Sequence, residues 1–399
     1  MERREFMKLM ALGTVATAGL GLQSCGALSG STAKAAKSVK LSKQKEWAKE
    51  HCKGIENLLI PSYLPDLKTL DEEGIRHDVR NSIRHGFFST CCFPIVTTVE
   101  AHKQFLQVAC AEAKGKILAG DIVGEKTKEG DMTMLSHAEK VGCTHVLIAP
   151  GRSLRAKTED ELYQGLLERI SAKALPVFLY ASASKSYQSF GPSGVPLRVF
   201  DRLADLPNVV GIKVSQALNM ATIFQICEKL SDRLLVGPVN LDFVPSLSRQ
   251  YHVQWSGQWN VESVQSPEKP YAVLLMKLLN EGRFDEAMKV YAQLEPALDA
   301  FYKLQAPLIL KGVHPYLHMK YFQWCVGGNG GLIPNLASIP PGLIPVLDAA
   351  ARKLIRDAYL KVGITPTAAP EEEFIVGKAA YARGVRAKDL AETPYYSVS

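Results

Sequence analysis

The chain has 399 residues, of which 47% are hydrophobic and 22% charged, and its formal net charge at pH 7 is +7. These proportions are those of a globular protein, and no long low-complexity segment is present. Because the positive charge is modest and no basic block is interleaved with aromatic residues, nucleic acid is not expected as a partner.

The first 25 residues predict an export signal that is not part of the fold. The paired Arg3 and Arg4 resemble the twin-arginine motif, and an apolar run over residues 9–22 follows, too short to span a membrane. The run ends in a segment that resembles a bacterial lipoprotein cleavage site, with Cys25 as the residue that would carry the lipid. We therefore expect export through the twin-arginine route, either to the periplasm or to a membrane lipid anchor. Residues 26–50 are predicted to form a flexible tether.

From about residue 55 onward, predicted strands and helices alternate with little interruption. The predicted strands are apolar, β-branched runs bounded by turn residues, at 57–61, 87–90, 116–121, 145–149, 176–181, 206–214, 233–237 and 252–256. The predicted helices between them cover 70–85, 97–114, 127–141, a segment that begins at Thr158, 195–205 and 218–231. Eight such units in about 200 residues favour a (β/α)8 TIM barrel over an open doubly wound sheet.

The chain is therefore predicted to be an α/β protein: a TIM barrel over residues 51–260 with a C-terminal helical extension over 261–364. Helices are expected in that extension at 271–280, 284–304 and 344–362. The remaining residues, 365–399, are predicted to form a polar tail with one short amphipathic segment at 371–383.

The eight cysteines are scattered and include no C-x-x-C pair. If Cys25 is lipidated, seven remain, and this odd number argues against a disulfide framework. The adjacent Cys91 and Cys92 have two interpretations, a redox pair or ordinary packing. Packing is favoured, because neighbouring side chains on a strand face opposite ways.

In a TIM barrel the active site lies at the carboxyl ends of the strands. Tyr180 ends the fifth predicted strand and Lys213 the sixth, so the two side chains are expected to be neighbours. An unprotonated lysine attacks carbonyl groups, and a tyrosine beside an amine can relay protons, so the pair suggests Schiff-base chemistry. The alternative is a strand-end lysine whose stem packs while its ammonium reaches water.

Two segments carry a resemblance to a known family. Pro176–Tyr180 and Leu203–Lys213 resemble the dihydrodipicolinate synthase/N-acetylneuraminate lyase family, a group of class I aldolases built on a TIM barrel with three C-terminal helices. The resemblance runs from about Leu58 to Ile364 and includes Leu70–Gly74.

The resemblance implies a role for each matching residue. Lys213 would form a Schiff base with a pyruvate-like 2-oxo acid, Tyr180 would act as the acid and base, and Gly237 would be the glycine that ends strand seven near the lysine. The resemblance implies that the reaction needs neither a metal nor a cofactor, because the lysine itself forms the covalent intermediate. It also implies self-association, because family members are often dimers or tetramers.

The sequence departs from the family where the substrate carboxylate is bound. The Gly-Thr-Thr-Gly-Glu loop after strand two is replaced by Ser89–Phe93, which leaves Thr90 and Cys91 as the predicted substrate contacts. The arginine of the synthases falls at Lys185 when counted forward from the tyrosine, and at Pro192 when counted back from the next matching segment. Lys185 is therefore a further candidate for substrate binding.

Two other residue groups also have two interpretations each. Trp255 and its neighbours on strand eight would either line a pocket for a sugar-like or aromatic substrate or fill the rim of the barrel. His314 and His318 have the i, i+4 spacing of metal ligands, but Pro315 lies between them and no third ligand is near in sequence, so no metal site is predicted.

The leading hypothesis is an exported class I aldolase or lyase that acts on a 2-oxo acid or a sugar-derived acid. Cleavage or dehydration is favoured over biosynthesis, because an exported enzyme meets scavenged substrates and the synthase loop is altered. The alternative hypothesis is a barrel without turnover that serves as a binding or scaffold protein of the cell envelope.

Overall fold

The computed structural model describes residues 42–96, 98–149, 151, 153–182, 187, 189–190, 194–215, 219–258, 261–309, 313–336 and 342–398. The predicted export signal with Cys25 lies outside the described residues, as do Lys185 and Pro192.

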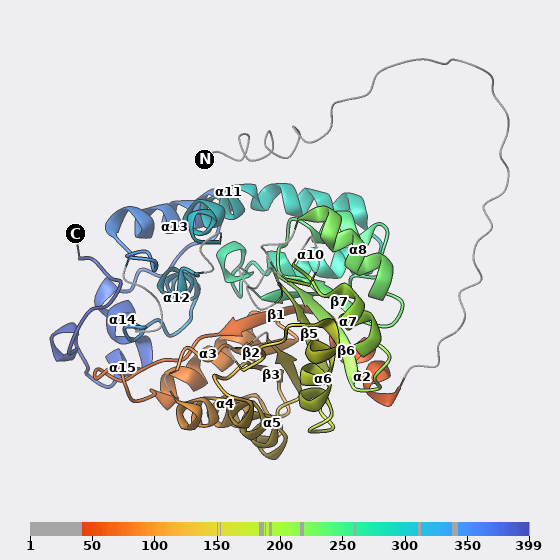
Figure 1. The fold of residues 1–399 in the computed structure, drawn as a ribbon. Coiled ribbons are helices and arrows are strands. Elements are labelled where there is room, and N and C mark those ends of the chain that lie inside the picture. Colours follow the sequence, from red (N-terminus) through yellow and green to blue (C-terminus); the bar gives the residue numbers. More distant parts are fainter. Residues whose placement is uncertain are drawn as a thin grey trace. The chain divides into compact units, whose positions relative to one another are not determined.

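Eight parallel strands form a nearly closed barrel, as predicted (Figure 1). They are β1 (Gly54–Leu59), β2 (Ser89–Cys92), β3 (Leu118–Val123), β4 (His145–Ile148), β5 (Val177–Ala181), β6 (Val209–Val214), β7 (Leu235–Pro238) and β8 (Trp255–Gln258). Their order in the sheet is β7-β6-β5-β4-β3-β2-β1-β8. Side chains of β8 complete the circuit: the Trp255 indole donates to the Leu235 carbonyl at 3.3 Å, and the Ser256 hydroxyl to the Pro238 carbonyl at 2.7 Å.

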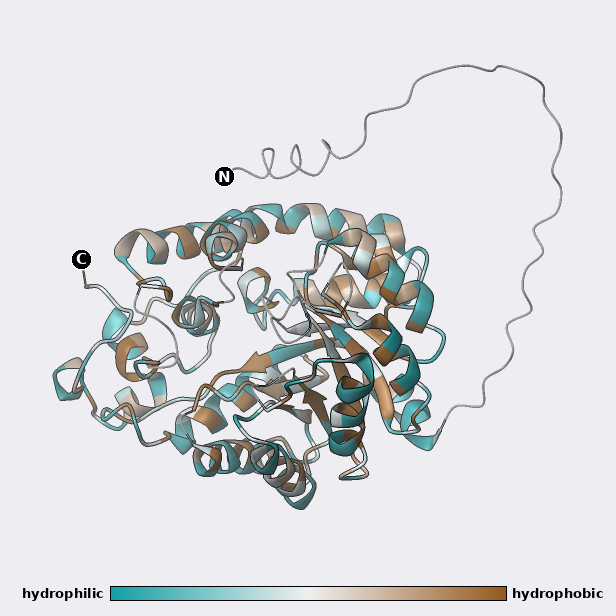
Figure 2. Cartoon of the chain, viewed as in Figure 1, coloured by the Kyte–Doolittle hydropathy of each residue, from teal (hydrophilic) through white to brown (hydrophobic). Residues whose placement is uncertain are grey.

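The strands are buried on both faces and carry mostly apolar residues. Figure 2 shows several of them in brown, whereas β1 is partly teal. The helices around them are α3 (Glu72–Arg84), α4 (Val99–Ala113), α5 (Lys128–Val141), α6 (Glu159–Ile170), α7 (Leu197–Leu203), α8 (Met220–Leu230) and the short α9 (Val244–Ser248). Five of these helices begin at a residue whose side chain accepts a backbone N–H of the first turn: Asp71, Thr98, Thr127, Thr158 and Asn219. Each such cap stabilises its helix by about 1 kcal/mol.

Helix α2 (Lys43–His51) corrects the predicted tether, which was expected to continue to residue 50. Ser42 caps this helix and also donates to the Pro207 carbonyl, while the buried Lys45 ammonium donates to the Ala204 carbonyl at 2.6 Å. Ala48 is fully buried. The last residues of the predicted tether are therefore packed beside the amino end of β6.

The C-terminal extension contains η1 (Val261–Val264), α10 (Tyr271–Asn280), α11 (Phe284–Ile309), α12 (Tyr316–Cys325) and α13 (Ala349–Lys361). Helix α10 has the predicted bounds, whereas α11 continues five residues beyond the predicted end, despite Pro296 and Pro307. Helix α12 was not predicted. All ten of its residues are buried, so its sequence lacks the polar face by which a surface helix is recognised.

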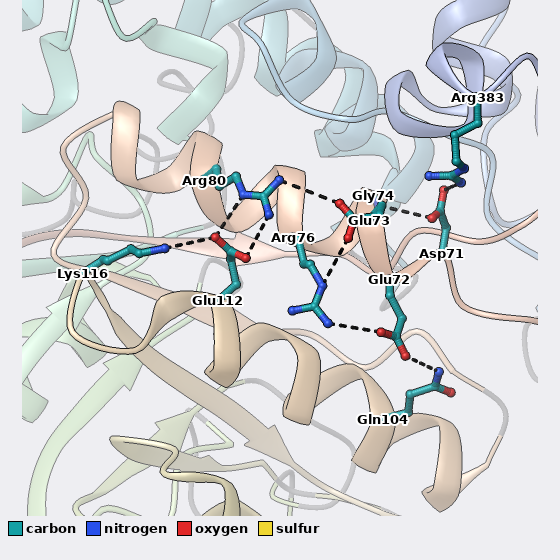
Figure 3. Close-up of polar contacts among 10 residues, drawn as sticks. All are labelled: Asp71, Glu72, Glu73, Gly74, Arg76, Arg80, Gln104, Glu112, Lys116 and Arg383. Atoms are coloured by element: carbon teal, nitrogen blue, oxygen red, sulfur yellow. Dashed lines mark hydrogen bonds and ion pairs between the residues drawn. The ribbon is translucent and has the colours of Figure 1, made fainter.

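The predicted polar tail is folded onto the barrel as α14 (Glu371–Val376), α15 (Lys378–Ala382) and η2 (Ala387–Asp389). Helix α15 packs against α3, and Arg383 reaches the buried Asp71 carboxylate at 2.7 Å (Figure 3). Within the described residues, no helix combines the length and apolarity that crossing a membrane requires.

Candidate active site

Lys213 and Tyr180 lie together at the carboxyl end of the barrel. The two residues are paired in register between β6 and β5, and Lys213 is also paired with Gly237 on β7. The lysine is 6% exposed, and its ammonium nitrogen lies 5.3 Å from the centroid of the Tyr180 ring. A cation at this distance is attracted by the face of the ring. The structure therefore places a nearly buried amine directly beside a phenol.

The interior of the barrel is layered around this pair. Position 237 requires glycine, because a Cβ atom there would lie 2.1 Å from the Trp255 ring. A Cβ at Gly257 would lie 3.0 Å from the same ring and 3.9 Å from Lys213 Cε. The two glycines thus leave room for the indole and for the stem of the lysine.

Of the two interpretations of Trp255, its position supports packing inside the barrel and corrects the predicted contact with substrate. Strand β8 begins at Trp255, three residues later than predicted, so the indole lies at the start of the strand and not at its carboxyl end. The residue is 1% exposed, and its ring packs edge-on against Phe178 at 5.0 Å. Trp255 therefore fills the barrel below the lysine and does not line an open pocket.

Strand β2 presents only alternate side chains to the interior. The Ser89 hydroxyl donates to the inner Glu56 carboxylate at 2.9 Å, so Ser89 and Cys91 face inward and Thr90 and Cys92 face the helices. Thr90 is fully buried on that outer face, which corrects its predicted contact with substrate. Cys91 shares the inner face with Lys213, and burial raises the pKa of its thiol well above the ordinary value.

Because Cys91 and Cys92 face opposite ways, they pack separately and do not form a redox pair. The seven cysteines in the described part of the chain all have free, buried thiols. Burial raises the pKa of Cys92 as well, so both groups are neutral thiols at physiological pH.

Glu56 and His145 are polar residues of the barrel interior that were not predicted from the sequence. Glu56 Oε1 lies 2.7 Å from His145 Nε2, and the two residues are 2% and 3% exposed. Burial favours a raised pKa for Glu56, but the charge and hydrogen bond of His145, the Ser89 hydroxyl and Lys213 together lower it. A glutamate directly before an apolar strand was the available signal, but the predicted strand began one residue after it.

The segment that leads into α12 lies near Lys213. Burial, followed by the positive charge of Lys213, lowers the pKa of His314 to about 4, so this imidazole is neutral at pH 7. Its ring packs edge-on against Tyr316 at 5.6 Å, and Tyr316 stacks on Phe93 just after β2. His314, whose spacing in the sequence suggested only metal binding, is therefore within electrostatic reach of the Lys213 amine.

His314 and His318 interact with different groups, since the charge that acts on His318 is that of Asp348. Across the described ranges, no group of three histidine, cysteine or acidic side chains is arranged to hold a metal ion.

The sequence matches the Dihydrodipicolinate synthetase family over residues 67–325, which is more than half of the chain. The chain belongs to this family. Its members are aldolases and lyases that form a Schiff base between a lysine and pyruvate, without a metal cofactor. Tyr180, Lys213 and Gly237 all lie within the matched residues.

Solved structures of the family share the fold at low sequence identity. The dihydrodipicolinate synthase from Aquifex aeolicus is 16% identical, with a TM-score of 0.61, and the match covers 79% of this chain and 99% of that one. The chloride-inhibited enzyme from Acinetobacter baumannii, complexed with pyruvate, is 15% identical, with a TM-score of 0.59 and the same coverage. PhdJ bound to a substrate intermediate is 14% identical, with a TM-score of 0.63, and covers 78% of this chain and 97% of its own. No curated protein sequence matches the chain significantly.

Proposed function

We propose that this protein is a Schiff-base-forming aldolase or lyase that acts on a pyruvate-like 2-oxo acid or a sugar-derived acid. Lys213 is the imine-forming nucleophile and Tyr180 the proton relay. The observation that carries the proposal is the register pair of these two residues, with the amine 5.3 Å from the ring, at the end of the barrel where such sites lie.

The chemistry follows from what the two groups can do. The unprotonated Lys213 amine adds to the carbonyl carbon of the 2-oxo acid, and the resulting carbinolamine loses water to give an imine. Tyr180 donates the proton with which the hydroxyl group leaves and takes it back when the imine is hydrolysed. The protonated imine at C2 accepts the electron pair of the C3–C4 bond when the C4 hydroxyl loses its proton, which releases an aldehyde and leaves an enamine; bond formation is the reverse of this step.

Cleavage or dehydration is the direction we propose. The family loop that holds the keto acid carboxylate is replaced here, and Thr90 faces the helices. The substrate of this enzyme is therefore held differently from that of a lysine-synthesis enzyme. A degradative reaction on scavenged acids also agrees with the proposed export.

The altered strand β2 favours a second candidate, a barrel without turnover that binds a ligand or a partner in the cell envelope. The two candidates differ in what the lysine does. Pyruvate release from a panel of sugar-derived 2-oxo acids, coupled to lactate dehydrogenase, measures cleavage, and mass spectrometry of the same mixtures for a product lighter by one water measures dehydration. The enzyme predicts one of these products and its loss in Lys213→Ala, whereas the binding protein predicts neither product and ligand binding that survives this substitution.

We also propose that the protein is exported through the twin-arginine route and self-associates. Replacing Arg3 and Arg4 by lysine should retain it in the cytoplasm. If Cys25 carries a lipid, Cys25→Ala should move the protein from the membrane fraction to the soluble periplasmic fraction. Sedimentation of the mature protein should show a species larger than the monomer.

A further inference from the structure

A carboxylate is buried in the barrel interior beneath the candidate active site. Glu56 is 2% exposed, and its layer otherwise contains large apolar groups such as Phe178 and Trp255. Burying a charge costs several kcal/mol unless partners compensate for the lost water, so an acid at this place requires a physical reason.

The carboxylate is held by a dedicated set of neighbours. The Ser89 hydroxyl donates to Glu56 Oε1 at 2.9 Å, and His145 Nε2 lies 2.7 Å from the same oxygen. A Cβ atom at position 120 would lie 2.4 Å from His145 Nε2, so Gly120 leaves the space that the imidazole occupies. Residues of β2, β3 and β4 thus hold the Glu56 carboxylate in one orientation.

His145 is the nearest partner of Glu56, and Lys213 is a second cationic group whose charge acts on this acid. Glu56 is paired in register with Gly257 of β8, and Gly257 is the residue against which the stem of Lys213 lies. Among the described residues, the ionisable groups that act on the lysine include Tyr180, Cys91, Glu56 and His314, and His145 lies against Glu56. Cys91 and His314 have pKa shifts that leave them neutral at pH 7, whereas the pKa of Glu56 is lowered.

We infer that Glu56 is a positioning residue whose carboxylate is the fixed counter-charge of the Lys213 ammonium and of the iminium that replaces it. The inference rests on the proposed Schiff-base function and names the group that stabilises its cationic intermediate. The carboxylate lies in the water-excluded interior, where a fixed charge acts more strongly than in solvent, and it needs no reorganisation when the cation forms. The contacts of the Glu56 carboxylate are Ser89 and His145, so we assign it a role that is exerted through Lys213.

The test measures the apparent pKa of Lys213 without any substrate. Trace acetylation with acetic anhydride at a series of pH values, followed by mass spectrometry of the Lys213 peptide, reports the fraction of unprotonated amine. Glu56→Gln should lower this apparent pKa by about one unit or more, because the ammonium loses its counter-charge. Glu56→Asp, which keeps the charge, should largely restore it.

Asp121→Asn is the matched control. Asp121 is also a fully buried carboxylate beside a histidine, since Asp121 Oδ1 lies 2.8 Å from His102 Nε2, but it faces the helices on the outside of the barrel. This substitution should leave the titration of Lys213 unchanged. An equal shift in Asp121→Asn and Glu56→Gln, or no shift in Glu56→Gln, would overturn the inference.

If Glu56→Gln does not fold, Lys213→Met tests the same coupling from the other partner, since the interaction of two titrating groups is reciprocal. The ¹³C carboxyl resonance of Glu56 should then titrate at a higher pH than in the unmodified protein, and an unchanged titration would overturn the inference.

The proposed function fails separately: a shifted Lys213 titration without any imine from 2-oxo acids would refute the aldolase and keep the counter-charge. Imine formation together with an unshifted Lys213 titration would keep the aldolase and refute the counter-charge.

Discussion

Lys213 and Tyr180 occupy paired positions on adjacent parallel strands, and the lysine nitrogen lies 5.3 Å from the centre of the tyrosine ring. The lysine is nearly buried, and the glycines at 237 and 257 keep the space beside its stem free of side chains. The proposed chemistry depends on this relationship. Substitutions of these residues and of their neighbours in the barrel can test it.

Tyr180→Phe should retain the ring beneath the amine but remove the proton relay. We expect imine formation with pyruvate to slow by a factor of about 10² or more, the usual contribution of a positioned acid or base, while the final adduct on Lys213 still forms. Stopped-flow trapping of the imine measures the rate. Tyr359→Phe, at a fully buried tyrosine of α13 that packs on Phe322, is the matched control, and equal effects of the two substitutions would contradict the assigned role.

Gly237→Ala should destabilise the barrel, because the added Cβ would lie 2.1 Å from the Trp255 ring. Overpacking of this kind costs about 1–3 kcal/mol, measurable by denaturant unfolding. The double variant Gly237→Ala/Trp255→Phe should recover part of that loss, because a smaller ring makes room for the methyl group. A double variant no more stable than Gly237→Ala would show that the indole is not the obstacle.

Arg383→Ala should loosen the C-terminal segment. The guanidinium is 41% exposed, but its partner Asp71 is 4% exposed and also caps α3 (Figure 3). Solvent screens the exposed arginine, so we expect a loss of about 1 kcal/mol together with faster proteolysis after residue 365. Arg76→Ala removes pairs between exposed groups on the same helix and should change stability by less than about 0.5 kcal/mol. Equal losses would argue against a specific anchor.

Glu262 should make stability depend on pH near neutrality. Burial raises its pKa to about 7, against the opposing hydrogen bonds from Asn57 and Gln323. Since the folded state then binds the proton more tightly than the unfolded state, this contribution is complete below about pH 4.5 and is lost as the pH rises through 7. Unfolding free energies of Glu262→Gln and of the unmodified protein between pH 5 and pH 8 should therefore diverge, with the variant less dependent on pH. Parallel curves would contradict the raised pKa.

His85 should act in the opposite direction at lower pH. Burial lowers its pKa to about 4, so the unfolded state binds the proton more tightly below about pH 6.5. Stability from this residue is lost as the pH falls from 6.5 to 4, and His85→Gln should reduce that loss in acid unfolding. An unchanged midpoint of acid unfolding in His85→Gln would contradict the lowered pKa of His85.

The barrel and the central pair were predictable because they depend on local pattern. Apolar strands alternate with capped helices, and Tyr180 and Lys213 stand at the ends of consecutive strands, which a parallel sheet brings together. The predictions for Trp255 and Thr90 were wrong because the start of a strand, or the face on which a residue lies, decides the outcome. A start of β8 three residues later moved Trp255 from the rim to the interior, and the alternation along β2 turned Thr90 outward.

The features that were not predicted depend on contacts between residues far apart in the sequence or on burial from all sides. Glu56 and His145 are 89 positions apart, and only closure of the barrel brings their side chains together. Helix α12 is buried on every side, so it shows no amphipathic period.

Borohydride reduction in the presence of pyruvate tests the central claim most directly. The protein should gain one reduced pyruvate adduct, and peptide mapping should place it on Lys213. Lys320, which is also buried but donates to the Pro61 carbonyl outside this pair, serves as the internal control and should remain unmodified. Absence of an adduct on Lys213 with pyruvate and with a panel of other 2-oxo acids would contradict the proposed Schiff-base enzyme.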